Sequence, residues 1–165
     1  MDIKESLAAA LPEMAPERYE TLPDIELYMD QLMEYLARRP VTLRGDGRLT
    51  GAMVNNYIKS GLLPRAKGKR YSREHIADLS VILRLKQVLS VADAGALLGF
   101  VRGDSYDNYY NSFCDCSQAV LAGLQEEIRA DKGSVEALAL RLALESSVKK
   151  AAAEYLISAL EKAEE

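Results

Sequence analysis

A short helix with firm ends at both sides is the feature that most constrains how this chain can fold. Thr50 is a helix N-cap residue, Gly61 favours the left-handed backbone that ends a helix, and Pro64 prevents the helix from resuming. At about 100° per residue, the segment between them separates its side chains by character. Its apolar face holds Met53, Val54, Tyr57 and Ile58, and its polar face holds Ala52, Asn55, Asn56 and Lys59. One face therefore suits a core and the other suits a partner.

The polar face has the chemistry of a nucleic-acid reader. Asn55 and Asn56 can each form two hydrogen bonds with an adenine edge, and Lys59 can reach guanine acceptors or a phosphate. Gly51 leaves the first-turn amides open to a phosphate. The alternative is an exposed helix whose polar side merely faces water, and the helix alone does not decide between the two interpretations.

A run of cations follows this helix directly, around a centre, Ala66-Lys67-Gly68, that can turn. We expect a small β-hairpin here. A cationic loop beside a polar helix is what docking on phosphates requires, although a charge run can also be only a solvated face. The adjacency of the two features favours phosphate contacts by Gly51, Arg65, Lys67, Lys69, Arg70 and Arg73.

Two segments of the chain, NNYIKSGLLP and KRYSREHIADLSVILRLKQVLSVAD, carry a resemblance to known proteins. They resemble the DNA-binding domain of MerR-type regulators, in which a recognition helix ends in Gly-Leu-Leu-Pro, a basic wing follows, and a tyrosine leads into the next helix. Over residues 21–98 the chain resembles still more closely a bacterial group known as domain of unknown function 1836, itself MerR-like. The resemblance implies a winged helix-turn-helix fold, double-stranded DNA as the partner, and a homodimer formed through a long C-terminal helix.

Charge is distributed as in an acidic chain with one basic module. The net charge of the 165 residues is −4. Residues 1–39 carry −5, residues 40–90 carry +7, and residues 91–165 carry −6. Such a protein binds nucleic acid poorly without specificity, yet it can orient its basic module toward a phosphate backbone. The acidic total therefore does not exclude DNA.

The expected fold is mainly α and has three parts. We expect a short helical or frayed leader at residues 1–20, a MerR-like winged helix-turn-helix domain with a β-hairpin wing at residues 21–103, and a helical hairpin at residues 104–165. In the second part, an apolar stripe predicts a first helix from Pro23 to just before Pro40. Further helices should begin after Ser72, Ser90, Ser105 and Ser134.

The last predicted helix is apolar on more than one side, beginning with VEALALRLAL. A lone helical hairpin cannot bury such a surface, so the helix must pack on the first domain, on a second copy of the chain, or on both. We therefore expect residues 104–165 to mediate dimerisation.

Catalytic and metal chemistry is poorly represented in the sequence. His75 is the single histidine, and we expect it on a helix surface. Cys114 and Cys116 would point about 200° apart on a helix and could not clamp one ion. Since no phosphate-cradling loop, nucleophile elbow or dinucleotide fingerprint is present, we expect no enzyme, no cofactor and no metal.

A cluster of Tyr106, Tyr109 and Tyr110 is the remaining candidate ligand site, although aromatic side chains at helical spacing more often pack than line a pocket. A small-molecule effector thus stays open. We expect no membrane segment, because no apolar run is long enough and the N-terminus is acidic, and two cysteines fit a reducing compartment such as the cytoplasm.

These features together predict a sequence-specific DNA-binding protein, a transcriptional regulator. Asn55, Asn56 and Lys59 would read bases in the major groove while the basic wing grips phosphates. The alternative is a protein-interaction adaptor that uses the winged-helix scaffold without DNA, with its basic surface on an acidic partner.

Overall fold

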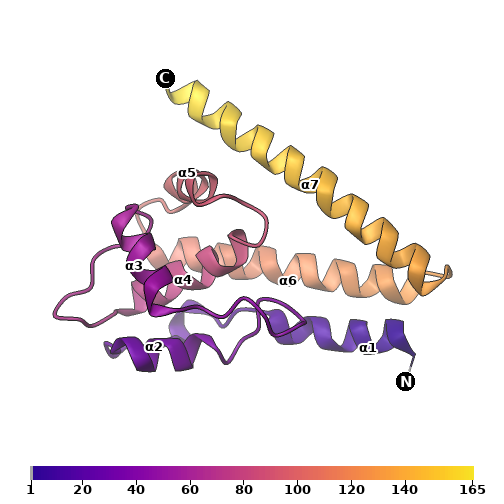
Figure 1. Ribbon diagram of the computed structural model, residues 1–165, viewed down its shortest axis with the longest axis horizontal. Helices are drawn as coiled ribbons and strands as arrows, with labels where there is room; N and C mark the ends of the chain where they lie inside the picture. The colour runs from indigo at the N-terminus through magenta and orange to yellow at the C-terminus, as the bar shows by residue number, and fades with distance from the viewer. Residues whose placement is uncertain (1) are drawn as a thin grey trace.

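The computed structural model describes residues 2–165, and helices joined by loops make up most of them (Figure 1). The mainly α expectation is confirmed. Within these residues, no helix combines the length and the apolar character needed to cross a bilayer. The α-helices are α1 (Ile3–Ala10), α2 (Met29–Leu36), α3 (Gly51–Lys59), α4 (Arg73–Leu85), α5 (Val91–Val101), α6 (Tyr106–Ala130) and α7 (Val135–Glu164), with short 3₁₀ turns η1 (Leu11–Met14) and η2 (Tyr19–Thr21).

Hydroxyl caps begin the helices where the sequence predicts them. The Thr50 hydroxyl accepts a hydrogen bond from the Met53 N–H at 3.2 Å, and Ser90, Ser105 and Ser134 cap α5, α6 and α7 in the same way. At the other end of α3, Gly61 has a φ of 77°, and the Leu62 N–H donates to the Tyr57 carbonyl at 2.9 Å. Both predicted ends of α3 are confirmed.

The first helix of the second part begins later than predicted, at Met29 rather than at Pro23. Leu27 and Tyr71 exchange two backbone hydrogen bonds, of 2.9 and 2.8 Å, which keep the residues before Met29 out of a helix. The side chain of Gln31 then accepts the Tyr28 N–H at 3.0 Å and closes the first turn of α2. The prediction was wrong because a pairing between segments distant in sequence outweighs local periodicity.

The expected β-hairpin wing is not formed as a ladder of strands. Within residues 2–165, β pairing is limited to two isolated bridges, Lys67 with Arg70 and Leu27 with Tyr71. The next hydrogen-bonded pair of such a ladder would be Arg65 with Ser72. It does not form because the Ser72 N–H donates to His75 Nδ1 at 3.0 Å and α4 begins directly after Ser72.

The chain nevertheless reverses tightly in this segment, and we call residues 64–70 the basic loop. Gly68 and Lys69 have φ values of 56° and 61°, the left-handed pair that a two-residue turn of this hand requires. Lys67 and Arg70 flank the turn and exchange hydrogen bonds of 3.2 and 3.0 Å. The tip of a hairpin is thus present without its strands.

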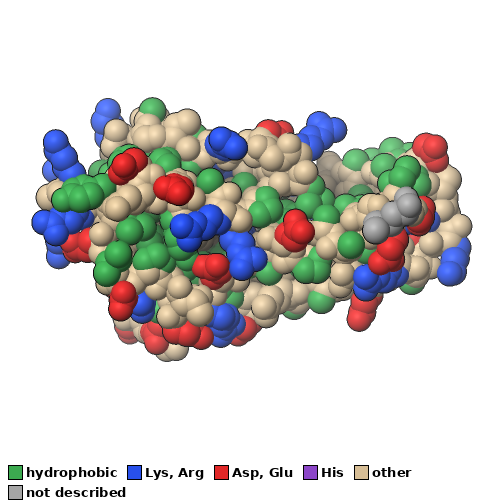
Figure 2. All heavy atoms as spheres, turned by 90° about the horizontal axis from the view of Figure 1, so that it is seen from below, with side chains coloured by type: hydrophobic (Ala, Val, Ile, Leu, Met, Phe, Trp, Pro, Cys, Tyr) green, Lys and Arg blue, Asp and Glu red, His purple; other side chains and the backbone are tan. Residues whose placement is uncertain are grey.

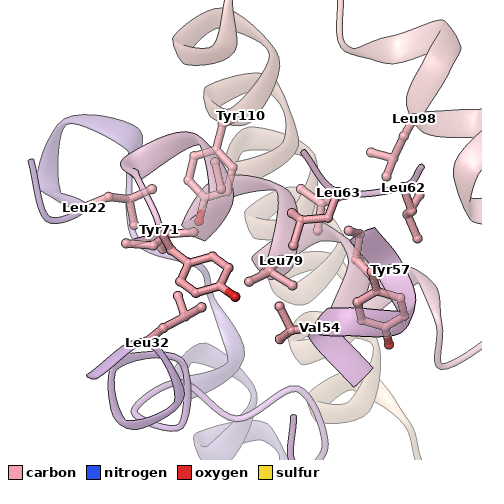
Figure 3. Close-up of a cluster of buried hydrophobic side chains, with 14 of the residues drawn as sticks. Leu22, Leu32, Val54, Tyr57, Leu62, Leu63, Tyr71, Leu79, Leu98 and Tyr110 are labelled. Atoms are coloured by element: carbon pink, nitrogen blue, oxygen red, sulfur yellow. The ribbon is translucent and has the colours of Figure 1, made fainter. Parts of the chain in front are cut away.

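One apolar core joins α2, α3, α4, α5 and the first half of α6 (Figure 3). Tyr109 and Tyr110 are buried in it, so these two tyrosines are packing residues. The core crosses from the predicted second part of the chain into the third. Its labelled members in Figure 3 are Leu22, Leu32, Val54, Tyr57, Leu62, Leu63, Tyr71, Leu79, Leu98 and Tyr110.

The leader is a docked helix, since α1 runs along α6 (Figure 1). Ala8 and Leu11 form a second apolar cluster with Ile128 of α6 and Leu138 of α7. The side-chain amide of Gln125 donates to the Ala8 carbonyl at 2.7 Å.

Helix α7 rises from its turn at an open angle to α6 (Figure 1). Near its start it packs through Leu138, and near its end Ile157 forms a third cluster with Leu89 and Ala94. No other part of residues 2–165 covers the outer side of α7, which exposes Leu140, Leu144, Val148 and Tyr155.

Cys114 and Cys116 are expected to differ sharply in their reaction with iodoacetamide. Cys114 is buried, and that burial raises the pKa of its thiol to about 11, so about one molecule in a thousand is thiolate there at about pH 8. Cys116 is exposed. Mass spectrometry after brief alkylation should find the label on Cys116, and in urea on both residues. Equal labelling of the folded protein would contradict this packing.

Candidate nucleic-acid interface

Helix α3 buries its apolar face and leaves its polar face in solvent. Val54 and Tyr57 are buried, whereas Asn55, Asn56 and Lys59 are exposed. The exposed side chains are held in place by the capped ends of the helix and by the core beneath it. All three residues predicted to read bases are therefore accessible to a partner.

A shallow hollow of about 470 Å³ joins α3 to the basic loop. Asn55 lies on its helical side, and Arg65 and Lys69 lie on its loop side. No acidic side chain lines it. The complete lining is Met29, Asn55, Ile58, Arg65, Ala66, Lys69 and Tyr71. Asn55 of α3 and the loop cations Arg65 and Lys69 thus belong to one surface. The other exposed residues of the predicted site lie outside its lining: Asn56, Lys59, Lys67 and Arg70.

The cations of the basic loop are exposed, and the tight turn projects them away from the core. Figure 2 shows Lys and Arg side chains gathered at the left end of the molecule, where α3 and the basic loop lie in Figure 1. Arg70 Nη1 lies 3.9 Å from a carboxylate oxygen of Glu26, and both side chains are about half exposed. Such an exposed pair is weak, so Arg70 stays available to an anion.

Arg73 and Gly51 lie outside this hollow. The Arg73 guanidinium stands over the Tyr19 ring at 5.4 Å, and its Nε donates to the Pro23 carbonyl at 3.4 Å. Gly51 is half-buried, and a Cβ there would lie 3.9 Å from Met29 side-chain atoms. Of the six residues predicted to contact phosphates, Arg73 is thus already bound to Tyr19 and Pro23, and Gly51 is partly covered by Met29.

His75 positions the basic loop, a role that the sequence did not reveal. It is buried, so its predicted place on a helix surface was wrong. The Ser72 N–H donates to its Nδ1 at 3.0 Å; because a backbone N–H can only donate, the ring proton is on Nε2, which donates to the Pro64 carbonyl at 3.0 Å. The available signal was its place three residues after the cap of α4, where a capping partner stands.

The buried carboxylate of Asp78 holds Arg102, and Arg102 in turn binds the segment that follows α3. Asp78 is fully buried; Arg102 donates from Nε to its Oδ1 at 3.1 Å, and Arg102 Nη2 lies 2.9 Å from its Oδ2 in an ion pair. The hydroxyls of Tyr106 and Tyr109 also donate to Asp78, at 3.1 and 3.4 Å. Burial raises the pKa of Asp78 above its ordinary value although Arg102 opposes this. Arg102 also donates to the Leu62 carbonyl at 2.9 Å, and so holds the segment after α3.

No metal-holding cluster accompanies this surface in the part of the chain that the structure describes. Residues 2–165 contain no group of three or more His, Cys, Asp or Glu side chains arranged to hold a metal ion. The chemistry of the surface is hydrogen bonding and positive charge.

Comparison with known proteins places the chain in one family. No curated protein and no solved structure matches it. Residues 17–113 match the family described as Domain of unknown function (DUF1836), and this segment contains α2 to α5, the basic loop and the bonds between Asp78 and Arg102. Because the match covers more than half of the chain, the protein belongs to the DUF1836 family.

Proposed function

We propose that this protein binds double-stranded DNA sequence-specifically, as a transcriptional regulator. Helix α3 is the recognition helix, and the basic loop takes the place that the wing has in a MerR-like winged helix. The observation that carries the proposal is the hollow shared by Asn55, Arg65 and Lys69, which joins a base-reading amide to phosphate-binding cations.

The size and side chains of α3 suit the major groove. A helix of 9 residues is about 14 Å long, and the major groove is about 12 Å wide. Asn55 and Lys59 are four residues apart and lie on one side of the helix, with Asn56 beside them. These three side chains read base edges, and Ala52 leaves room for close approach.

The basic loop supplies the contacts to the phosphate backbone. Arg65, Lys67, Lys69 and Arg70 are exposed around the turn. Four phosphate contacts make the logarithm of the affinity fall with the logarithm of the salt concentration at a slope of about −3.6 per protomer.

Selection of bound sequences from a random duplex pool, followed by a salt titration on the enriched sequence, tests the proposal. We expect one enriched motif and a steep salt dependence. If no sequence is enriched from the pool, or if the affinity does not change with the salt concentration, the proposal is wrong. A pull-down that returns one acidic protein and no DNA would support the adaptor alternative.

We further propose that the protein acts as a homodimer through α7. The outer side of α7 carries a stripe of uncharged side chains about 30 Å long, bordered by Arg141 and Glu154. Leu140, Leu144, Val148 and Tyr155 on it are 63%, 59%, 70% and 75% exposed. The whole stripe is Ala137, Leu140, Leu144, Ser147, Val148, Ala151, Tyr155, Ser158 and Ala159, all exposed.

The order of side chains in this stripe suits a second copy of the same helix. An antiparallel copy centred between Ser147 and Val148 places Leu140 opposite Tyr155 and Leu144 opposite Ala151. Every contact is then made twice, as a two-fold interface requires, and a large residue faces a small one near the centre. A dimer also suits DNA, because it presents two recognition helices to two half-sites.

Replacing Leu144 and Val148 together by glutamate is expected to weaken dimerisation at least about 100-fold, because four carboxylates would then be buried in an apolar interface and the two at position 148 would lie close together beside the two-fold axis. Size-exclusion chromatography with light scattering measures the result. Val120→Glu is the control, since Val120 is 65% exposed on α6 and lies off the stripe. A wild-type protein that remains monomeric at high concentration would contradict the proposed dimer.

A further inference from the structure

A small cavity lies between the end of α2, the middle of α4 and the start of α6, and Asn55, Arg65 and Lys69 do not line it. Its volume is about 30 Å³, room for about two water molecules or one small anionic group. Leu22, Leu36 and Leu83 form its apolar walls, and Tyr110 closes one side. The cavity can therefore hold a polar head and contact a short apolar body.

Arg84 brings a positive charge to this cavity without a carboxylate partner. Its Nη1 donates to the Ser80 carbonyl at 2.9 Å and its Nη2 donates to the Met14 carbonyl at 3.0 Å. Within residues 2–165, no carboxylate oxygen lies within 4.0 Å of a guanidinium nitrogen of Arg84, the limit for a salt bridge. A guanidinium has five N–H donors, so several stay free to bind an anion.

Two further arginines line the same cavity, at the end of α2. Arg38 and Arg39 lie there, and one Nη of Arg39 is 3.4 Å from a carboxylate oxygen of Glu17. Glu17 also accepts a hydrogen bond from the hydroxyl of Tyr35. Among residues 2–165, it is the single acidic residue in the lining. The lining of the cavity thus contains three guanidinium groups and one carboxylate, and the carboxylate pairs with Arg39.

This excess of positive charge is costly in a partly buried place. Burial lowers the pKa of Arg84, and the charge of Arg39 nearby acts in the same direction. Two backbone carbonyls and the Phe113 ring, whose centroid lies 5.7 Å from the Arg84 guanidinium carbon, offset part of this cost. An anion that binds to the guanidinium offsets more of it.

We propose that this cavity binds a small organic carboxylate. The carboxylate lies on the free donors of Arg84 with Arg38 and Arg39 at the entrance, and the short apolar body contacts Leu22, Leu36 and Leu83. A planar guanidinium meets a carboxylate through two parallel hydrogen bonds, which gives the site its preference for this group. The inference does not depend on DNA binding.

Thermal unfolding followed by circular dichroism tests the site, with sodium acetate, isobutyrate, benzoate or phosphate compared with sodium chloride at equal ionic strength. We expect at least one carboxylate to raise the Tm by about 4 °C at about ten times its Kd. Arg84→Met should abolish this rise. Arg129→Met is the matched control, because Arg129 is an exposed arginine of α6 far from the lining residues, and it should keep the rise.

Because Arg84→Met also removes the hydrogen bond to Met14, a second variant, Arg38→Gln with Arg39→Gln, is made in parallel. It should weaken the carboxylate response at least about tenfold in concentration. Equal Tm values in chloride and in every carboxylate would overturn the proposal. So would a carboxylate response that both variants keep, and a response to phosphate alone would replace the carboxylate by an inorganic anion.

Discussion

Replacing Arg65, Lys67 and Lys69 together by alanine is expected to weaken binding to every DNA duplex by about 500-fold for each bound protomer at about 0.1 M monovalent salt. The reason is the release of counterions from DNA, to which each lost phosphate contact contributes a slope of about 0.9. The salt dependence should accordingly become flatter by about 2.7 units for each bound protomer. Fluorescence anisotropy of a labelled duplex over a salt series measures both quantities.

The matched control removes three cations elsewhere. Lys132, Lys149 and Lys162 are exposed near or on α7, and their joint replacement by alanine changes the net charge by the same amount. It should alter the affinity by less than about threefold, because distant exposed charges are screened at this ionic strength. Equal losses in both triple variants would contradict the basic loop as the site of phosphate contact.

Asn55→Ala separates base reading from phosphate contact. It should relax the sequence preference, at a cost of about 1–3 kcal/mol for the base that Asn55 reads, and leave the salt slope unchanged. A uniform loss across all sequences would instead assign Asn55 to the backbone.

Asp78→Ala is expected to lower the free energy of unfolding by about 3 kcal/mol and the Tm by about 10 °C. The variant removes the acceptor of two tyrosine hydroxyls and of Arg102, in a place that water does not reach. The Arg102 side chain is 26% exposed and can be partly hydrated, which places the expected loss at the lower end for a broken buried pair. Urea unfolding followed by circular dichroism measures it.

Two variants bracket this result. Asp104→Ala changes an exposed acid between α5 and α6, two residues after Arg102, and should shift the free energy of unfolding by less than about 0.5 kcal/mol. Tyr106→Phe removes one of the hydrogen bonds to Asp78 and should cost about 1 kcal/mol. A loss below about 1 kcal/mol for Asp78→Ala would show that the carboxylate contributes little to the fold.

The sequence predicts those features whose causes are local. Thr50 and Gly61 bound α3 because a hydroxyl cap and a left-handed glycine act within one turn of helix. The same reasoning finds the starts of α5, α6 and α7, and the exposure of Asn55 follows from helical periodicity.

Features that depend on distant pairings escape such reasoning. The late start of α2 follows from the bridge between Leu27 and Tyr71, which no local pattern announces. The wing lacks strands because α4 begins at Arg73, directly after the tight turn. Asp78 and Arg84 occupy one helix, and periodicity places them near the core but cannot name Arg102 or Met14 as their partners. The basic surface was predictable from the distribution of charge along the chain, whereas the cavity beside Arg84 depends on how α2, α4 and α6 pack together.

Lys69 combines a charge with a backbone conformation that suits it poorly. Its φ of 61° costs a lysine about 1 kcal/mol relative to glycine. Glycine there would make the turn more resistant to heat and would remove one cation from the proposed DNA surface. Laboratory evolution that selects for thermal stability alone would therefore favour glycine at this position. The same change would lower the affinity of the proposed DNA surface, so that thermal stability and DNA affinity are opposed at a single residue.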